Sequence, residues 1–297
     1  MQAAWQALVA AVDWLQPEST ALDYNATESG PCAAPIIACE RSIDMVDNPA
    51  LPSEFAAAWA QVADVQGWMS IDQAQRVWDA AQRVGNGGRI VEIGSYHGRS
   101  AIVAALAAPH AGEIVAIDPH AGNDRGPQEW DGVPEDGESD NQIFEANLRR
   151  AGVREHVRHV REMSSTAYGD VPGAIDLLYV DGSHRFAAAR ADIVGWGAKV
   201  DDGGTMLVHD SYSSIGVTFA LLTTTAIDGR WRYVGRTRSM TEYHRENLSA
   251  RGRLTNGLRQ AAVLPWFARN LMIKAMISVK LGKLTKLIGH DGHTWPY

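Results

Sequence analysis

Residues 89–243 alternate between short apolar runs and longer stretches of helical length. A strand is expected at each of seven runs, at 89–93, 113–117, 157–161, 174–180, 205–208, 231–234 and 239–243. Helices are expected between them, over about 99–108, 141–152, 185–200 and 215–226. Strands that alternate with helices form a parallel sheet covered on both faces, and apolar runs without period-two alternation suit its buried strands. The sequence therefore predicts a doubly wound α/β domain with a mostly parallel, seven-stranded sheet.

Helical additions are expected on both sides of this domain. Residues 1–84 combine a proline-broken stretch with a helix over 53–84, for which Ser53 is the expected N-cap. The sheet-forming domain is expected to span 85–246. Residues 247–297 are expected to form a basic, helical C-terminal extension.

The overall charge and the cysteines argue against several classes of protein. A formal net charge of −8 disfavours a general nucleic-acid binder, which needs basic surface to displace counterions from phosphate. Cys32 and Cys39 are the only cysteines, and two free thiols are favoured over a small disulfide. No basic residue precedes Arg41, so no secretory signal is expected, and no run of roughly 18 apolar residues predicts a transmembrane helix. A cytoplasmic location is therefore expected.

A long polar connection follows the second expected strand. Residues 120–140 are rich in Gly, Pro, Asp and Glu and contain little apolar surface. Loops of this length are usually functional lids or disordered segments, and both interpretations stay open. Trp130 in this loop and Tyr212 are candidates for substrate contact, although packing more often explains a lone aromatic residue.

A glycine turn follows the first expected strand. Glu92 lies in the strand, Gly94 ends it, and Gly98 opens the following helix. Glycine lets the backbone turn tightly and approach a ligand closely. Tyr96 occupies the second glycine position of the dinucleotide fingerprint, and its ring together with His97 would crowd a pyrophosphate. The turn therefore favours a ligand without phosphates and disfavours a nicotinamide oxidoreductase.

Asp118, at the end of the second expected strand, is the candidate for binding a ribose. A carboxylate at this place in a doubly wound sheet accepts hydrogen bonds from ribose hydroxyls. A glycine turn followed by such an acid predicts a nucleoside ligand. The alternative is that Asp118 only forms a turn before Pro119.

Acids and histidines follow the fourth and fifth expected strands. Asp181 ends the fourth strand, and Asp210 follows His209 at the end of the fifth. Neighbouring parallel strands bring both carboxylates to one edge of the sheet, where they repel each other unless a proton or a cation lies between them. Oxygen ligands suit Mg²⁺, and His209 is a candidate third ligand. Helix capping, packing, or binding of a cofactor amine by Asp181 are the alternatives.

Four ordered motifs within residues 85–245 resemble those of class I S-adenosylmethionine-dependent methyltransferases. They are V-E-I-G-S-Y-H-G-R-S from Val91, I-D-P-H from Ile117, L-Y-V-D-G-S-H from Leu178 and G-G-T-M-L-V-H-D from Gly203. The resemblance is greatest to the branch with metal-dependent sugar O-methyltransferases and cephalosporin-hydroxylase-like proteins. It implies a Rossmann-like fold, S-adenosylmethionine (SAM) as cofactor, and a sugar or glycan hydroxyl as methyl acceptor. A small phenolic or antibiotic acceptor, and a non-catalytic nucleoside-binding scaffold, are the alternatives.

The resemblance also implies roles for individual residues. The implied cofactor contacts are Glu92, Gly94, Ser95, Tyr96, Gly98, Ser100, Asp118, Met163, Ser164, Ser165 and Asp181. An Asp-x-x-His element in such relatives supplies a metal ligand and a general base, which matches Asp181 and His184. The expected ligands of Mg²⁺ or another divalent cation are Asp181, His209 and Asp210. The cation would lower the pKa of the acceptor hydroxyl, and His184 would take its proton. His209 departs from these relatives, which often carry an acid there.

The last part of the chain is basic and has one apolar helical face. No Asp or Glu occurs between Asn247 and His290, where eight basic residues lie: Arg251, Arg253, Arg259, Arg269, Lys274, Lys280, Lys283 and Lys286. Spacings of three and four place five apolar residues on one face of a helix over 264–289: Ile273, Ile277, Leu281, Leu284 and Ile288. We expect this face to pack on the domain or to form a homodimer. The alternative is peripheral contact with an anionic membrane.

Overall fold

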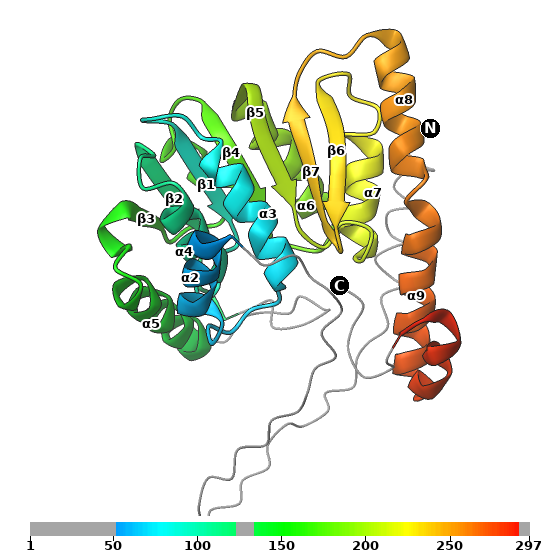
Figure 1. Cartoon of the computed structure of the whole chain (residues 1–297), viewed down its shortest axis with the longest axis horizontal. Coiled ribbons are helices and arrows are strands. Elements are labelled where there is room, and N and C mark those ends of the chain that lie inside the picture. The colour runs from blue at the N-terminus through cyan, green and yellow to red at the C-terminus, as the bar shows by residue number, and fades with distance from the viewer. Residues whose placement is uncertain (1–51, 123–133, 291–297) are drawn as a thin grey trace, which may run out of the picture.

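Residues 52–122 and 134–290 are described by the computed structural model (Figure 1). Cys32 and Cys39, most of the 120–140 loop, and Trp130 within it lie outside the described residues, so the predictions on them are not tested. Within the described ranges, no helix is long and apolar enough to cross a membrane.

The described part of the chain forms one seven-stranded sheet in the order β3-β2-β1-β4-β5-β7-β6. Its strands are β1 (Arg89–Ile93), β2 (Glu113–Ile117), β3 (Val157–Val160), β4 (Ile175–Val180), β5 (Val200–Val208), β6 (Trp231–Thr237) and β7 (Met240–Arg245). Strands β1 to β5 are parallel, whereas β7 runs antiparallel to both of its neighbours, β5 and β6. The predicted doubly wound, mostly parallel sheet is confirmed.

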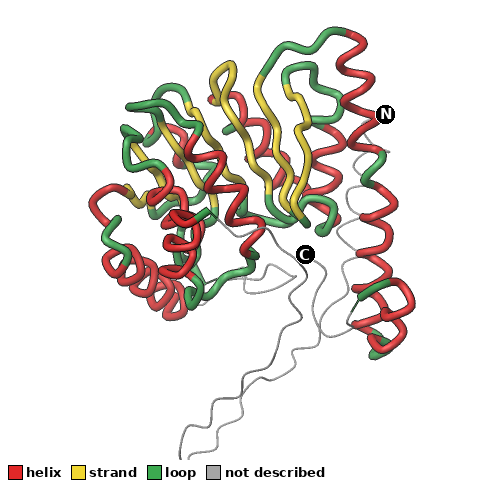
Figure 2. The backbone as a smooth tube through the Cα atoms, in the orientation of Figure 1, coloured by secondary structure: helices red, strands yellow, loops and turns green. Residues whose placement is uncertain are grey.

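Helices cover both faces of this sheet (Figure 2). They are α2 (Ser53–Val62), α3 (Ile71–Gln82), α4 (Arg99–Ala107), α5 (Pro134–Arg150), α6 (Phe186–Gly195), α7 (Ile215–Thr223), α8 (Ala250–Ala261) and α9 (Leu264–Ser278), with 3₁₀ turns η1 (Arg154–His156), η2 (Ala167–Gly169), η3 (Gly197–Lys199) and η4 (Gly282–Ile288). Residues of α2 to α5, such as Phe144, share one core with Ile90 of β1. Residues of α6 and α7, such as Phe186, share the opposite core with Val91. The side-chain alternation of β1 thus separates the two layers.

The single helix expected over 53–84 is wrong, because the chain makes α2 and α3 instead. Between them, the Arg99 guanidinium donates hydrogen bonds to the carbonyl oxygens of Gly67 and Met69, each at 2.9 Å. These bonds hold the connection as a turn around a side chain from α4. Ser70 then starts α3 with a capping box, in which its side chain and that of Gln73 satisfy each other's backbone N–H groups.

Two helix starts also differ from the prediction. Helix α5 begins at Pro134, not near 141, and carries two acids in its first turn. Gly137 conceals this start in the sequence, yet a Cβ there would lie 2.1 Å from the carbonyl oxygen of His120. Glycine therefore lets α5 contact the chain that leaves β2. The expected N-cap at Ser53 is wrong, because Pro52 holds that position.

The helix expected over 185–200 is too long, and the strand after it is too short. Helix α6 ends at Gly195, η3 follows, and β5 already begins at Val200. The pairing of β5 with β4 is irregular between the partners of Ile175 and Leu177, and residues 201–203, two acids and a glycine, are exposed there. Because residues 201–204 are acids and glycines, the start of this strand shows no apolar pattern in the sequence.

The continuous helix expected over 264–289 is also wrong. Helix α9 ends at Ser278, Lys280 takes a positive φ of 62°, and η4 folds back against α9. The Arg269 side chain fixes this arrangement by donating to the carbonyl oxygens of Ile288 and Gly289, each at 2.9 Å. Ile273 is buried as the periodicity predicts, whereas Leu281 and Leu284 beyond the break are exposed.

Candidate active site

The carboxyl ends of the parallel strands β2, β1, β4 and β5 meet at the lower edge of the sheet (Figure 1). Open α/β sheets bind their ligands at this edge, where the strand order reverses direction. The predicted site residues that follow these strands are therefore brought together. Different local interactions hold each of these residues in place.

Gly94 allows the ends of β1 and β4 to approach each other. Its φ is +83°, and a Cβ there would lie 2.1 Å from the carbonyl oxygen of Asp181. The end of β1 is bonded to both neighbouring strands, because Gly94 N donates to Ile117 O of β2 at 2.9 Å and Asp181 N, directly after β4, donates to Ile93 O at 2.8 Å. The residue at 94 must therefore lack a side chain both for its backbone angle and for space.

Asp118 holds the turn that follows Gly94. Its Oδ2 accepts hydrogen bonds from the backbone N–H groups of Ser95 and Tyr96, both at 2.8 Å, and its Oδ1 accepts from His120 N at 2.8 Å. The turn-forming role that the sequence left as an alternative is therefore present. An ionised carboxylate accepts about four hydrogen bonds, so Asp118 retains capacity for a ribose hydroxyl.

We expect Asp118→Ala to lower the free energy of unfolding by on the order of 2 kcal/mol, because three backbone N–H groups lose a charged acceptor. Asp118→Asn should cost less, since its carbonyl oxygen still accepts. Urea denaturation of the two variants measures the difference. If the alanine variant were as stable as the wild type, Asp118 would not support the turn.

Glu92 lies buried beneath the same turn. Its Oε1 accepts a hydrogen bond from Ser100 Oγ, and its Oε2 is buried without a hydrogen-bond partner in the described part of the chain. Burial raises the pKa of Glu92 to about 7. A buried carboxylate oxygen without a partner is costly unless a ligand donates to it, which suits the predicted cofactor contact.

Tyr96 and His97 pack together instead of lying apart in the turn. Their rings stack with centroids 3.8 Å apart. His97 Nε2 lies 2.9 Å from Asp140 Oδ1 of α5, and both side chains are buried. Gly98, with a φ of +87°, begins α4 where a Cβ would lie 3.1 Å from the ring of Phe144. His97 and Gly98 thus serve the packing of α5 on this loop.

Residues 163–165 follow β3, beside the end of β2. Ser164 Oγ donates to Asp192 Oδ1 at 2.6 Å, and the Ser164 carbonyl accepts from Trp196 Nε1 at 3.1 Å, whereas Met163 is exposed. From the sequence, Asp192 is predicted to be a structural or surface residue. The structure buries it, with Oδ2 3.5 Å from the position of a Cβ on Gly182. The available signal was that Asp192 is the single acid of helix α6.

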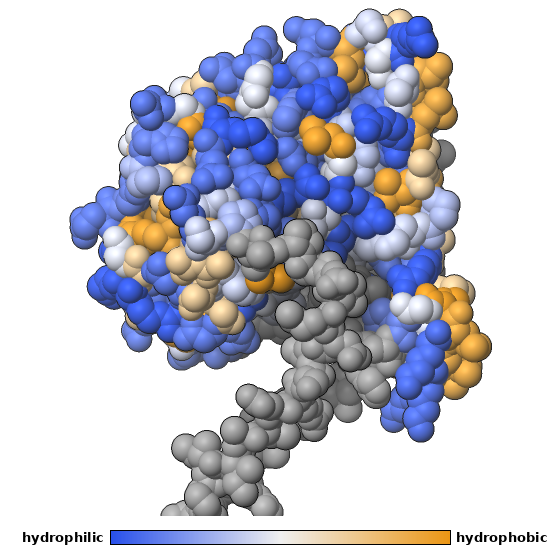
Figure 3. Space-filling model, viewed as in Figure 1, coloured by the Kyte–Doolittle hydropathy of each residue, from blue (hydrophilic) through white to orange (hydrophobic). Residues whose placement is uncertain are grey.

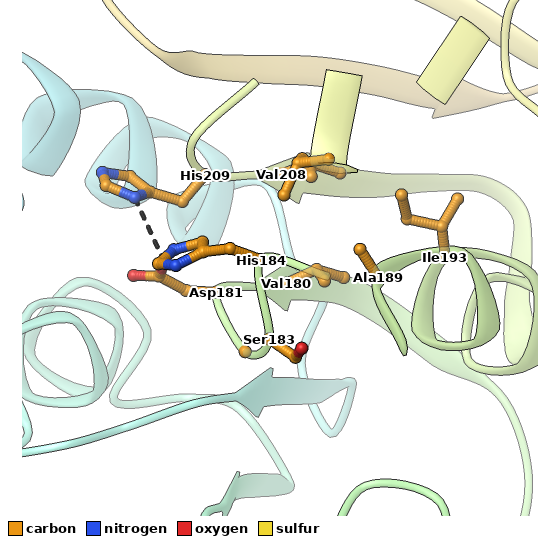
Figure 4. A pocket seen from close by; sticks show the side chains of 10 residues that line it. Val180, Asp181, Ser183, His184, Ala189, Ile193, Val208 and His209 are labelled. Carbon is orange, nitrogen blue, oxygen red and sulfur yellow. Dashed lines mark ion pairs between the residues drawn. The ribbon is translucent and has the colours of Figure 1, made fainter. Parts of the chain in front are cut away.

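Asp181, His184 and Asp210 converge at the ends of β4 and β5. Ligand atoms of these three side chains all lie within 4.8 Å of one another. His184 Nε2 lies 2.7 Å from Asp210 Oδ2, and 26% of the His184 side chain is exposed. His209 is almost fully buried beside them, with Nδ1 3.1 Å from Asp181 Oδ1 and 3.3 Å from Asp210 Oδ2. Figure 4 shows His184, Asp181 and His209 grouped on one side of this site, away from the apolar Ile193.

The charges of this cluster support one another. Burial disfavours a charged His209, but attraction to Asp181 and Asp210 prevails and holds the pKa of His209 well above its usual range. Burial likewise disfavours the Asp210 carboxylate, but His209 and His184 hold the pKa of Asp210 well below its usual range. Ionised carboxylates only accept hydrogen bonds, so His209 Nδ1 is the donor to both. His209 therefore draws the two acids together.

Comparison with known proteins identifies this arrangement. Residues 91–211, which include the glycine turn and the Asp–His cluster, match a family model described as a methyltransferase domain. Residues 91–211 therefore carry a methyltransferase domain. The prediction of this class is confirmed, while its sugar-methylating and cephalosporin-hydroxylase-like branch stays a prediction.

Solved structures share the fold of the methyltransferase domain. An SAH-bound methyltransferase from Podospora anserina aligns with a TM-score of 0.50 and 16% identity, over 73% of this chain and 100% of that one. A protein from Corynebacterium glutamicum aligns with a TM-score of 0.50 and 13% identity, over 68% and 93%. At such identities the likeness shows the fold alone.

Helix α9, outside the matched segment, supports the catalytic edge of the methyltransferase domain. The loop after β5 is strained, with φ angles of 51° at Asp210 and 57° at Tyr212. Asn270 Nδ2 donates to Tyr212 O at 3.3 Å, and Lys274 Nζ donates to Ser213 O at 2.9 Å. Sequence reasoning missed both residues. Their signal is two polar side chains, four residues apart, on the face of α9 that is otherwise apolar.

Proposed function

We propose that this chain transfers the methyl group of SAM to a hydroxyl oxygen, and that His184 takes the hydroxyl proton. The observation that supports this most is the pair of His184 Nε2 and Asp210 Oδ2, 2.7 Å apart, at the ligand-binding edge of the sheet. The carboxylate fixes the orientation of the ring. A histidine whose one nitrogen is engaged by a carboxylate is made more basic at the other nitrogen.

The residues around the glycine turn suit SAM rather than a dinucleotide. SAM carries a ribose, a sulfonium and an ammonium group, but no phosphate. Asp118 offers a carboxylate for the ribose, and the unsatisfied Oε2 of Glu92 offers an acceptor for a polar group. The Podospora anserina methyltransferase of the same fold is bound to SAH, the product that SAM leaves after methyl transfer.

Methyl transfer is a displacement in which acceptor oxygen, methyl carbon and sulfur lie in line. The protein has to orient the two substrates and remove one proton. Asp181 adjoins both the glycine turn and His184. An acceptor hydroxyl that enters between them would therefore meet the base on one side and the methyl group on the other.

A divalent cation fits the same edge. Asp181 and Asp210 would hold it, and when bound it would lower the pKa of a hydroxyl that coordinates it. Two converging carboxylates beside an imidazole are a donor set that suits Mg²⁺ or Mn²⁺. His209, the predicted third ligand, directs its Nδ1 to both carboxylates. It would therefore orient the ligands, and its own coordination stays a prediction.

The proposed acceptor is a hydroxyl of a sugar or glycan, on the strength of the sequence resemblance. A small phenolic or antibiotic compound is the alternative within the same reaction. A non-catalytic nucleoside-binding scaffold is disfavoured, because such a protein has no use for the aligned pair of His184 and Asp210 beside a second acid, Asp181.

Calorimetry and turnover assays on the intact chain test this function. We expect SAM to bind with a Kd on the order of micromolar and NAD not to bind, because Tyr96 and His97 are expected to crowd a pyrophosphate. Excess EDTA is expected to abolish methyl transfer to a glycan without changing the Kd of SAM, and added Mg²⁺ or Mn²⁺ to restore it.

The possible results separate the parts of the proposal. Full activity in excess EDTA would contradict the role of a cation and would still be consistent with His184 as the base. Binding of NAD in place of SAM would contradict the methyltransferase activity itself. Mass spectrometry of glycan and phenolic acceptors after incubation identifies the class of acceptor.

A further inference from the structure

The C-terminal end of the described chain exposes large aliphatic side chains in a row. Val279, Leu281, Leu284 and Leu287 are 64%, 50%, 47% and 85% exposed. Figure 3 shows this apolar area next to strongly hydrophilic residues, at the lower right where η4 lies. We name the exposed residues of segment 279–288 the C-terminal surface. A cluster of exposed aliphatic side chains often marks a binding site, whereas single exposed ones are common on any protein surface.

The 3₁₀ geometry of η4 arranges this surface in two stripes. Side chains three residues apart lie above one another in a 3₁₀ helix. Leu284 and Leu287 therefore form one stripe, continued by Leu281 at the start of η4. The exposed Lys283 and Lys286 form an adjacent stripe. The surface thus presents leucines with a border of positive charge.

The fold holds this surface in place. Thr285 is buried on the inner side of η4, where its Oγ1 donates to Gly282 O at 2.6 Å. Arg269 binds the carbonyl oxygens of Ile288 and Gly289 from α9. The leucines are therefore displayed by a fixed helix that turns its polar contacts inward and its apolar side chains outward.

We propose that the C-terminal surface binds anionic membranes. Leucines suit the acyl boundary of a bilayer, and lysines beside them suit lipid phosphates. Charge decides against a symmetric contact with a second copy, because residues 247–290 contain eight basic residues and no acidic one. Two such surfaces would repel each other, whereas an anionic lipid surface complements the charge.

The position of this surface has a consequence for the acceptor, which rests on the proposed function. Lys274 ties α9 to the loop of Asp210, and η4 extends beyond the same lower edge at which the parallel strands end (Figure 1). A membrane bound by the C-terminal surface therefore lies on the side of the active site. The acceptor class that this geometry favours is a hydroxyl compound with a lipid anchor.

Co-sedimentation of the full chain with vesicles tests the surface without any turnover. Vesicles of phosphatidylcholine alone are compared with vesicles that also contain about 30% phosphatidylglycerol. We expect binding to the anionic vesicles only. Replacement of Lys280, Lys283 and Lys286 by glutamine should weaken binding on the order of 100-fold. Replacement of Leu281, Leu284 and Leu287 by serine should weaken it at least about tenfold.

A matched control removes exposed leucines from a different place. Leu254→Ser with Leu258→Ser on α8 takes away residues that are 66% and 62% exposed, and this variant should bind vesicles like the wild type. No preference of the wild type for anionic vesicles would overturn the proposal. So would sedimentation analysis in which the leucine variant turns a dimer into a monomer while vesicle binding is unchanged. Vesicle binding without methyl transfer would instead contradict the proposed function, and the proposal that the C-terminal surface binds membranes would still hold.

Discussion

Replacement of His184 by glutamine is expected to lower kcat by about 10²–10⁴-fold, because the variant has no base for the proton of the acceptor hydroxyl. Glutamine keeps a side-chain N–H that donates to Asp210, the partner of His184 Nε2 at 2.7 Å, so the loop after β5 keeps this contact. The Kd of SAM should change little, since the imidazole acts on the acceptor. Initial rates with labelled SAM give kcat, and calorimetry gives the Kd.

The matched control for this variant is His110→Gln. His110 is exposed and precedes β2, at the opposite edge of the sheet from the site. Its replacement should leave kcat unchanged. A His184→Gln enzyme whose kcat stays within about threefold of the wild type would show that another group takes the proton, since general-base catalysis is worth far more than that.

Gly94→Ala is expected to lower the free energy of unfolding by about 2–5 kcal/mol and to abolish SAM binding. Alanine is strained at a φ of +83°, and its Cβ would lie 2.1 Å from the Asp181 carbonyl oxygen and 2.6 Å from the Asp181 carbonyl carbon. Backbone atoms of β4 cannot turn aside as a flexible side chain can. The end of β4 would therefore have to move, and Asp181 with it.

Gly203→Ala separates the two causes. Gly203 has a φ of +87°, nearly that of Gly94, but no atom lies within 4 Å of the position of its Cβ. Its replacement should cost only about 1–2 kcal/mol for the backbone angle and leave SAM binding intact. Urea unfolding and calorimetry measure both variants. Equal losses of stability in the two would show that the contact with Asp181 carries no cost.

The sheet was predictable from the sequence because its strands are buried on both faces. Residues 89–93 and 113–117 are expected strands whose bounds match β1 and β2. A continuous apolar run leaves little freedom in where such a strand begins and ends. The start of β5 was missed for the opposite reason, since residues 201–203 are exposed and carry no apolar pattern.

The errors in the helices arose where distant side chains decide the local structure. Arg99 divides the expected helix over 53–84 through hydrogen bonds to carbonyl oxygens that a sequence pattern does not reveal. Arg269 fixes η4 in the same way. Helical periodicity records which face is apolar, but it does not record a guanidinium from elsewhere that binds the backbone.

The site was predictable in its main features and not in its details. Strand order alone places Asp181 beside Asp210, and the structure brings them together with His184. The direct pairing of His184 with Asp210 depends on a positive φ at Asp210, which no pattern indicates. The support from Lys274 was also hidden, because charge patterning suggested an exposed basic face and the side chain instead reaches Ser213.

The contacts from α9 to the loop after β5 determine when during synthesis this loop can be supported. On the ribosome, β5 and its loop emerge well before Asn270 and Lys274, which later bind Tyr212 and Ser213. A nascent chain with a complete sheet therefore still has an unsupported Asp210. The loop that carries Asp210 therefore gains this support only after α9 has been synthesised. A protease that removes α9 from the folded protein would remove the same two contacts, and the loop of Asp210 would again lack support.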